Sequence, residues 1–224
     1  IQNPQTFMTA DGPQGPIFQC LFFNDHNEAI VFTNRIYAVD LATARLTQLV
    51  SEKGIQPFPD IDVNSVIQDA RGHYWVSNLA MTGEFIRRGD SLILVKRYTT
   101  QDGLGCAWVH ELYPDRQGRV WAFAQNGLNG IDPQTREIRQ FGVREGLVDP
   151  YIDPRQVLTL KDGRIATVNG SGIIVFHPDS LWNAYTREQI PIVLKEIRIA
   201  GQRVSYSGDV NFISNLELDP GQHY

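Results

Sequence analysis

The sequence has no long apolar run and no cluster of basic residues. Its apolar stretches extend over only a few residues, whereas a helix needs about 20 apolar residues to cross a bilayer. Lys and Arg are dispersed and the formal net charge is −5, whereas binding to phosphates needs clustered positive charge. We therefore expect no membrane-spanning segment in these residues and no nucleic-acid partner.

Cysteine is scarce, with only Cys20 and Cys106 among 224 residues. Two cysteines are too few for a disulfide framework and too isolated for a metal site. Two separate, small, hydrophobic side chains are the simpler interpretation. The sequence also lacks a phosphate-binding glycine loop and a Gly-x-Ser-x-Gly turn around a nucleophile.

Histidines and carboxylates are present, but not at the spacing of a metal site. His26, His73 and His177 fall at or beside expected turns, at different offsets. The acidic pairs have neither the alternation nor the late Glu of a calcium loop; these pairs are Asp60 with Asp62 and Asp149 with Asp153. We expect no metal, no cofactor and no catalytic residue in this chain.

What is present is a short repeated phrase, Asp-x-x-Gly-x-x-Trp. Its two full copies are Asp69, Gly72, Trp75 and Asp115, Gly118, Trp121. Weaker copies follow Leu160 and begin at Asn24, where Asn27 replaces the glycine and tolerates the same positive φ. A repeat of about 45 residues indicates a repeating architecture.

Each repeat divides into four short segments rich in Val, Ile and aromatic residues. In the third repeat they read WVHELY, RVWAFA, LNGIDP and EIRQFG, which predicts four strands. Only residues 179–189 suggest a turn or two of helix. Four strands in about 45 residues are typical of a β-propeller blade. In this interpretation the Asp and Gly close the first hairpin, and the Trp fills the wedge between blades.

The predicted fold class is all-β, with two parts. Residues 1–189 form a β-propeller fragment of about four four-stranded blades, starting near Phe18, Val63, Trp108 and Gln156, plus one strand of a preceding blade. Residues 190–224 change to alternating apolar positions, which predicts the first strands of an immunoglobulin-like β-sandwich. The chain starts without Met and stops inside this pattern, so we expect a fragment of a longer protein.

These features together resemble a known sensor family. The repeated Asp-x-x-Gly-x-x-Trp turns, the DGL and EGL markers, and the ending PIVLKEIRIAGQRV…LELDPGQHY are similar to two-component regulator propeller repeats followed by a Y_Y_Y domain. That pairing occurs in the periplasmic sensor region of hybrid histidine kinases, common in Bacteroidetes. The first and fourth repeats depart from the pattern because they lack the Trp.

The resemblance implies a periplasmic fragment that binds a ligand and takes part in signalling across the membrane. Its partners would be a small, glycan-derived oligosaccharide, the rest of its own propeller and Y_Y_Y domain, and a second receptor subunit in a dimer. The phosphotransfer chemistry would belong to other parts of the parent protein, so this fragment would not be an enzyme.

A ligand would bind where the loops entering the inner strands crowd one rim of the propeller. Sugar recognition favours an aromatic platform surrounded by planar polar groups. The candidates are Trp108, His110, Gln125, Asn126, Tyr151 and Arg155. Packing of Trp108 within its strand, and a loop-stabilising role for Tyr151 and Arg155, remain open alternatives.

Two other functions are open. Streptogramin lyases share a propeller and similar repeats, and here only His110 with Glu111 could supply a catalytic pair. Adjacent residues on a strand point to opposite faces, which weakens that pair. The third possibility is a scaffold that binds another protein through its rim.

Overall fold

The structure is a computed structural model that describes residues 20–24, 26–32, 35–51, 63–79, 81–152, 154, 157–184, 198–199 and 202–203. The chain divides into two compact units, Ile1–Tyr185 and Thr186–Tyr224. In the second unit, β16 (Arg198–Ile199) and β17 (Gln202–Arg203) form a short hairpin. Among the helices described, none has the length and apolar character required to span a membrane.

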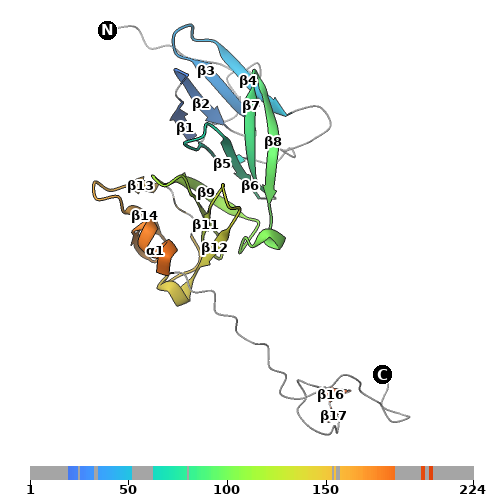
Figure 1. Cartoon of the computed structure of the whole chain (residues 1–224), viewed down its shortest axis with the longest axis vertical. Coiled ribbons are helices and arrows are strands. Elements are labelled where there is room, and N and C mark those ends of the chain that lie inside the picture. Colours follow the sequence, from blue (N-terminus) through green and yellow to red (C-terminus); the bar gives the residue numbers. More distant parts are fainter. Residues whose placement is uncertain are drawn as a thin grey trace. The chain divides into compact units, whose positions relative to one another are not determined.

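The first unit consists of successive antiparallel meanders, which we call blades A to D (Figure 1). Blade A comprises β1 (Cys20–Phe23), β2 (Glu28–Phe32), β3 (Ile36–Asp40) and β4 (Leu46–Ser51). Blade B comprises β5 (Val63–Gln68), β6 (Tyr74–Asn78), β7 (Thr82–Arg88) and β8 (Ser91–Tyr98). Blade C comprises β9 (Val109–Pro114), β10 (Val120–Ala124), β11 (Gly127–Ile131) and β12 (Ile138–Phe141).

Blade D differs from this pattern. It contains β13 (Val157–Thr159), β14 (Ile165–Asn169) and β15 (Gly172–Phe176), followed by helix α1 (Pro178–Ala184). Within residues 157–184, a helix rather than the predicted fourth strand follows β15. The helix lies close to the residues where the sequence suggested helical turns. The contacts of the first strands β5 and β9 with each other place them at the inner side of neighbouring blades.

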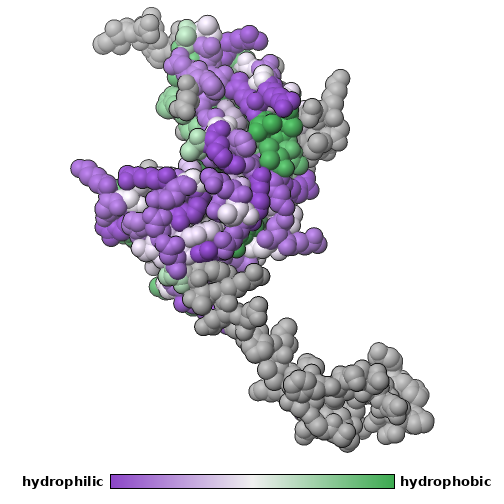
Figure 2. Space-filling view, in the orientation of Figure 1, coloured by the Kyte–Doolittle hydropathy of each residue, from purple (hydrophilic) through white to green (hydrophobic). Residues whose placement is uncertain are grey.

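Blades A and B are joined by a feature that the repeat does not predict. The end of β4 pairs in parallel with the start of β8, with Val50 opposite Ser91. The Val50 amide donates to the Asp90 carbonyl at 2.9 Å. The two meanders thereby become one eight-stranded sheet. Figure 2 shows an apolar area over β8 on a face that is otherwise mostly hydrophilic.

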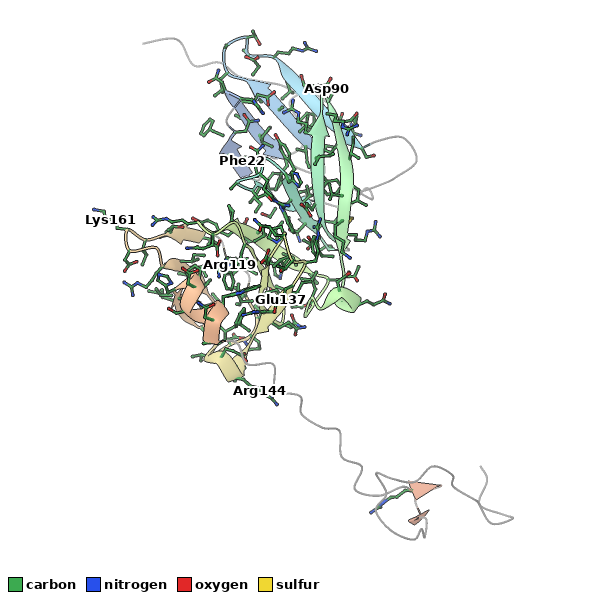
Figure 3. The ribbon with its side chains drawn as sticks, viewed as in Figure 1. Phe22, Asp90, Arg119, Glu137, Arg144 and Lys161 are labelled. Atoms are coloured by element: carbon green, nitrogen blue, oxygen red, sulfur yellow. The ribbon has the colours of Figure 1, made fainter. Side chains whose placement is uncertain are left out.

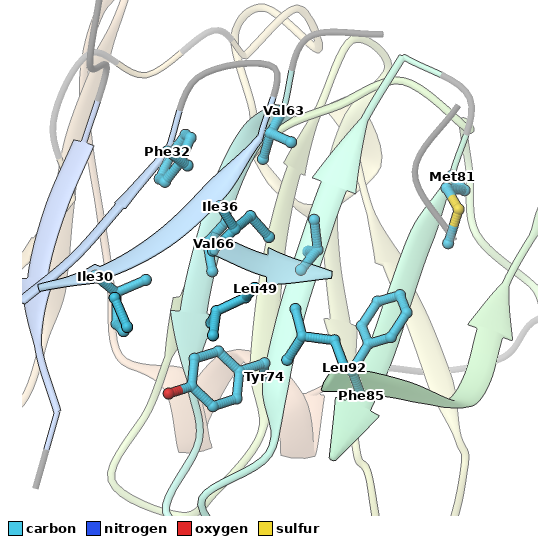
Figure 4. Packing of buried hydrophobic residues seen from close by; sticks show 12 residues of the cluster. Ile30, Phe32, Ile36, Leu49, Val63, Val66, Tyr74, Met81, Phe85 and Leu92 are labelled. Atoms are coloured by element: carbon cyan, nitrogen blue, oxygen red, sulfur yellow. The ribbon is translucent and has the colours of Figure 1, made fainter. Parts of the chain in front are cut away.

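The core lies between the blades, because successive side chains of each strand point to opposite faces. Tyr74 and Val76 of β6 belong to the cluster shared by blades A and B (Figure 4). Trp75, between them, belongs to the cluster of blades B and C. Trp121 of β10 belongs to the corresponding cluster of blades C and D. The prediction that both tryptophans wedge neighbouring blades apart is confirmed.

The repeated Asp and Gly close the first hairpin of blades B and C, as predicted. One oxygen of Asp115 accepts the amides of Gln117 and Arg119, both at 2.9 Å. Asn24 accepts two amides in the same way in blade A, from His26 and Glu28. Gly72 and Gly118 have φ values of +79° and +84°, which a residue with a Cβ rarely adopts.

A direct bond between the first and last residues of the phrase was not predicted. The indole nitrogen of Trp75 donates to Asp69 Oδ2 at 2.9 Å. Trp121 donates to Asp115 Oδ2 at the same distance. Both indoles are fully buried, and a buried N–H needs an acceptor. The carboxylate therefore satisfies the turn with one oxygen and the wedge with the other.

Helix α1 fills the outer part of the wedge between blades C and D. Trp182 packs edge-on to Trp121, with ring centroids 6.5 Å apart. The Arg139 guanidinium lies over the Trp182 ring at 4.1 Å. Gly130 makes room, because a Cβ there would lie 3.0 Å from the Trp182 ring. Arg119 ion-pairs with Asp179 of α1, and Figure 3 labels Arg119 beside the helix.

Two predictions fall outside the described residues. The strand of a preceding blade was predicted within residues 1–19, and the start of an immunoglobulin-like sandwich within residues 190–224. Only the β16–β17 hairpin of the latter range is described. Both remain predictions.

We expect the bond between Asp115 and Trp121 to contribute measurably to stability. Asp115→Asn keeps an oxygen for the turn amides, but it leaves the buried indole N–H without a good acceptor and removes the ion pair with Arg119. The free energy of unfolding should fall by about 2 kcal/mol, a typical cost of such a group. Urea unfolding of Asp115→Asn, Trp121→Phe and the double variant would isolate the bond as a coupling energy. Asp162→Asn, at the exposed fourth hairpin, is the control, and additive effects would contradict the prediction.

We also expect the isolated chain to self-associate through the face of blade D that points away from blade C. Leu158, Val168, Ile173 and Val175 share that face and are 41%, 46%, 77% and 43% exposed. The corresponding faces of blades B and C are covered by the next blade. Ile173→Lys should lower the molar mass measured by light scattering, whereas Val143→Lys, at another exposed valine, should not. A monomeric wild-type chain would contradict this.

Candidate functional site

The loop entering blade C is held by side chains of the two outer strands of that blade. Gln140 donates to the Gly103 carbonyl at 2.7 Å, and Asn129 accepts the Gly105 amide at 2.9 Å. Asn126 also donates to the Gly105 carbonyl. The Gly103 φ of +111° turns the chain into this loop. The loop therefore presents Trp108 from a fixed backbone.

The loop entering blade D is held in a similar way by the β14–β15 turn. Asp149 accepts the Tyr151 amide at 2.9 Å with one oxygen and the Ser171 hydroxyl at 2.8 Å with the other. The Ile152 amide donates to the Ala124 carbonyl at 3.3 Å, and the Ile152 side chain is fully buried. Tyr151 therefore has a defined position beside blade C.

Three aromatic side chains meet where these two loops converge. The rings of Trp108 and His110 have centroids 5.4 Å apart. His110 and Tyr151 make an edge-to-face contact at 5.7 Å. Trp108 and Tyr151 are 39% and 43% exposed. The cluster of Trp108, His110 and Tyr151, which we call the rim cluster, is a continuous and partly exposed aromatic surface.

Two of the other three predicted ligand residues lie on the turn beside the rim cluster. The backbone amide of Gln125 donates to the Trp108 carbonyl at 3.3 Å, and the Gln125 side chain is exposed. Asn126 is exposed and is bonded to the entering loop. Arg155 lies outside the described residues. The structure thus brings together three of the six predicted residues and places two more on the adjacent turn.

A β-bulge in β9 lies at His110, directly before Glu111. Register shifts between Phe123 and Ala124, so that three residues of β9 lie opposite two of β10. A bulge redirects side chains. The Glu111 carboxylate accepts the hydroxyl of Ser65 in blade B, whereas His110 contacts the rim cluster. As the sequence indicated, the two side chains point to different surroundings.

Burial raises the pKa of Glu111 to about 7, although hydrogen bonds from Ser65 and the Leu112 amide oppose this. The matching bulge in β5 lies at Asn64, whose side-chain amide donates to the Val109 carbonyl at 2.9 Å. The Leu112 amide donates to the Ser65 hydroxyl at 3.1 Å. The two bulges therefore lock the inner strands of blades B and C together.

A second polar cluster, which sequence reasoning missed, surrounds Glu84 at the outer side of the same two blades. Glu84 Oε1 accepts from Arg71 at 2.7 Å and contacts His73 Nδ1 at 2.7 Å. Its other oxygen accepts from Tyr98 at 3.2 Å and pairs with Arg136 of blade C. Burial acts to raise the pKa of Glu84, but these partners outweigh it and hold the pKa below its ordinary value.

Asp69, His73 and Glu84 have ligand atoms within 4.8 Å of one another, a spacing that could hold a metal ion. The charges argue against one. Arg71 pairs with both carboxylates, and Arg136 pairs with Glu84. Two guanidinium groups already balance two carboxylates, so a cation would meet repulsion at short range. We therefore interpret this cluster as a structural junction between blades B and C.

No family model matches the chain, and no curated protein matches it. Solved structures do. One, described as the extracellular domain of the hybrid two component system BT3049 from B. thetaiotaomicron, is 18% identical with a TM-score of 0.66. The match covers 79% of this chain and 23% of the other. BT4673 of the same organism, described in the same terms, is 19% identical over 72% of this chain and 23% of its own, with a TM-score of 0.59.

A third similar structure is an enzyme. Virginiamycin B lyase from Staphylococcus aureus, in an inactive H270A form with quinupristin, is 15% identical with a TM-score of 0.52. That match covers 74% of this chain and 57% of the lyase. At these identities the likeness establishes the fold, a β-propeller fragment. The chain spans about a quarter of the length of the two extracellular domains.

The raised pKa of Glu111 predicts a loss of stability as pH rises. In the unfolded chain its pKa returns to about 4.3, so the folded state binds the extra proton between there and about 7. Stability should therefore fall between pH 5 and pH 8, by up to about 3 kcal/mol. Glu111→Gln should remove most of this fall in urea unfolding. Equal pH dependence in the variant would contradict the prediction.

Proposed function

We propose that this chain is part of the extracytoplasmic, ligand-sensing region of a two-component sensor, and that the rim cluster contacts a small oligosaccharide. The observation that carries the proposal is the rim cluster itself, a partly exposed aromatic surface at the edge of the propeller fragment. Propeller-type extracellular domains of hybrid two component systems are among the structures similar to this chain, which supports the choice of a sensor.

The chemistry of the rim cluster suits a sugar. Aromatic faces pack against the apolar face of a pyranose ring, while nearby planar groups bond to its hydroxyls. Gln125 and Asn126 provide such groups on the adjoining β10–β11 turn. Because neighbouring side chains fix the entering loops, little ordering would be needed on binding, which favours affinity.

The wider assignment follows from the same proposal. The chain would lie in the periplasm as part of an inner-membrane histidine kinase and would work as a dimer with the remaining blades and a Y_Y_Y domain. Residues 1–185 would bind and position the ligand, and other parts of the polypeptide would carry out phosphotransfer. No catalysis is assigned to this chain.

Titration calorimetry against a panel of neutral and acidic oligosaccharides tests the proposal, using the 224-residue chain and the longer protein that contains it. At least one glycan should bind saturably. Trp108→Ala should weaken that binding at least tenfold, because it removes the larger exposed ring of the rim cluster. Phe23→Ala is the matched control, since Phe23 is an exposed aromatic side chain on blade A.

Three outcomes would oppose the proposal. They are the absence of binding by the longer protein to every glycan of the panel, equal losses of affinity in both variants, and an enzymatic activity abolished by His110→Ala. The last would favour a lyase. Binding of another protein with no response to any glycan would favour a scaffold instead.

A further inference from the structure

A polar groove lies between blades A and B, at the end of the blades away from the rim cluster. Its volume is about 500 Å³, within the roughly 300–1,000 Å³ range of small-molecule sites. The β1–β2, β5–β6 and β7–β8 turns form it. In an antiparallel meander these turns lie at one end, and the β2–β3 turn and the loops entering each blade lie at the other.

The charged side chains that line the groove are mostly basic. The four basic ones are His26, Arg71, His73 and Arg87, and Glu28 is the only acid among the lining residues that the structure describes. Both oxygens of Glu28 are occupied, because Arg87 pairs with it through two nitrogens at 2.6 and 3.1 Å. Asn24 also donates to Glu28 at 2.8 Å. Glu28 and Arg87 thus neutralise each other, which leaves His26, Arg71 and His73 as the basic groups available to a ligand.

Carboxylates behind the groove wall hold Arg71 and His73 in place. The Asp69 and Glu84 side chains are 1% and 0% exposed, so solvent and ligands do not reach them. Arg71 bonds to them through Nε and Nη2, and His73 through Nδ1. No described residue accepts from Arg71 Nη1 or bonds to His73 Nε2. Two positioned nitrogens therefore remain for a ligand.

The equivalent space between blades C and D has a different character. It is only about 110 Å³, and three carboxylates, from Asp115, Asp162 and Asp179, line it together with the basic residues Arg116 and His177. Arg119, which corresponds to His73 in the repeat, turns to Asp179 of α1 instead. The basic groove is therefore a property of one pair of blades and not a consequence of the repeat.

From these observations we infer that the groove between blades A and B binds an oxyanion, such as a sulfate, phosphate or carboxylate group carried by a small molecule. Arg71 Nη1 and the His73 and His26 rings are the donors. Buried carboxylates fix Arg71 and His73 before the ligand arrives, so little ordering is needed on binding. A guanidinium group forms the strong, charge-assisted hydrogen bonds that oxyanions accept, and an imidazole N–H adds a further donor.

The test is titration calorimetry of the 224-residue chain with sodium sulfate, sodium phosphate and sodium glucuronate, at constant ionic strength set with sodium chloride. At least one anion should bind saturably at one site. Arg71→Gln should weaken that binding at least tenfold, and His26→Ala about threefold. Binding of sulfate or phosphate alone would indicate an esterified ligand, and binding of glucuronate alone a carboxylate ligand.

Arg164→Ala is the control, because Arg164 is an exposed arginine paired with Asp162 on the hairpin of blade D. It should leave the affinity unchanged. His26 is exposed, so its variant should fold even if Arg71→Gln does not, and near-UV circular dichroism checks both. The inference is overturned if no anion binds saturably, if a folded Arg71→Gln or His26→Ala variant binds as wild type does, or if Arg164→Ala loses as much. None of these outcomes bears on glycan binding at the rim cluster.

Discussion

The arrangement of these blades depends on a buried carboxylate that bonds to a turn and to an indole at once. In blade C, Asp115 fixes the β9–β10 hairpin with one oxygen and orients Trp121 with the other. In blade B, Asp69 does the same for Trp75. The hairpin is a local structure, whereas the indole is the largest side chain in the wedge. Coupling them ties the position of the wedge side chain to a seven-residue phrase, and this explains why that phrase is repeated so closely in blades B and C.

What lies opposite the indole differs from wedge to wedge. Glu84 pairs with Trp75 in the sheet, and Gly130 pairs with Trp121 at the corresponding place. Glu84 reaches across to Arg136 and forms a charged junction. Gly130 leaves space that Trp182 of α1 occupies. One backbone register therefore supports a polar junction in one wedge and a helix anchor in the next. A buried carboxylate with several partners favours a single arrangement, because losing any partner leaves charge uncompensated.

The two ends of the blades have different chemistry. At one end the entering loops bring aromatic rings together, and the proposed glycan contact lies there. At the other end, hairpin turns present basic groups that are backed by Asp69 and Glu84. Both sites depend on side chains that are fixed before any ligand arrives. The bulges in β5 and β9 connect the inner strands of blades B and C, and these two blades carry residues of both sites.

The sequence by itself determined the repeat, the hairpins, the strands of blades B and C and the rim position of Trp108, His110 and Tyr151. Each follows from local spacing: turn residues, alternation and a period of about 45 residues. Only the tertiary structure decided the partners of Glu84, the packing of Trp182 of α1 against Trp121, and the groove between blades A and B. Glu84 and Arg136 are 52 residues apart, and Arg139 and Trp182 are 43 apart. No local pattern encodes such pairs, because they form only once neighbouring blades have packed against each other.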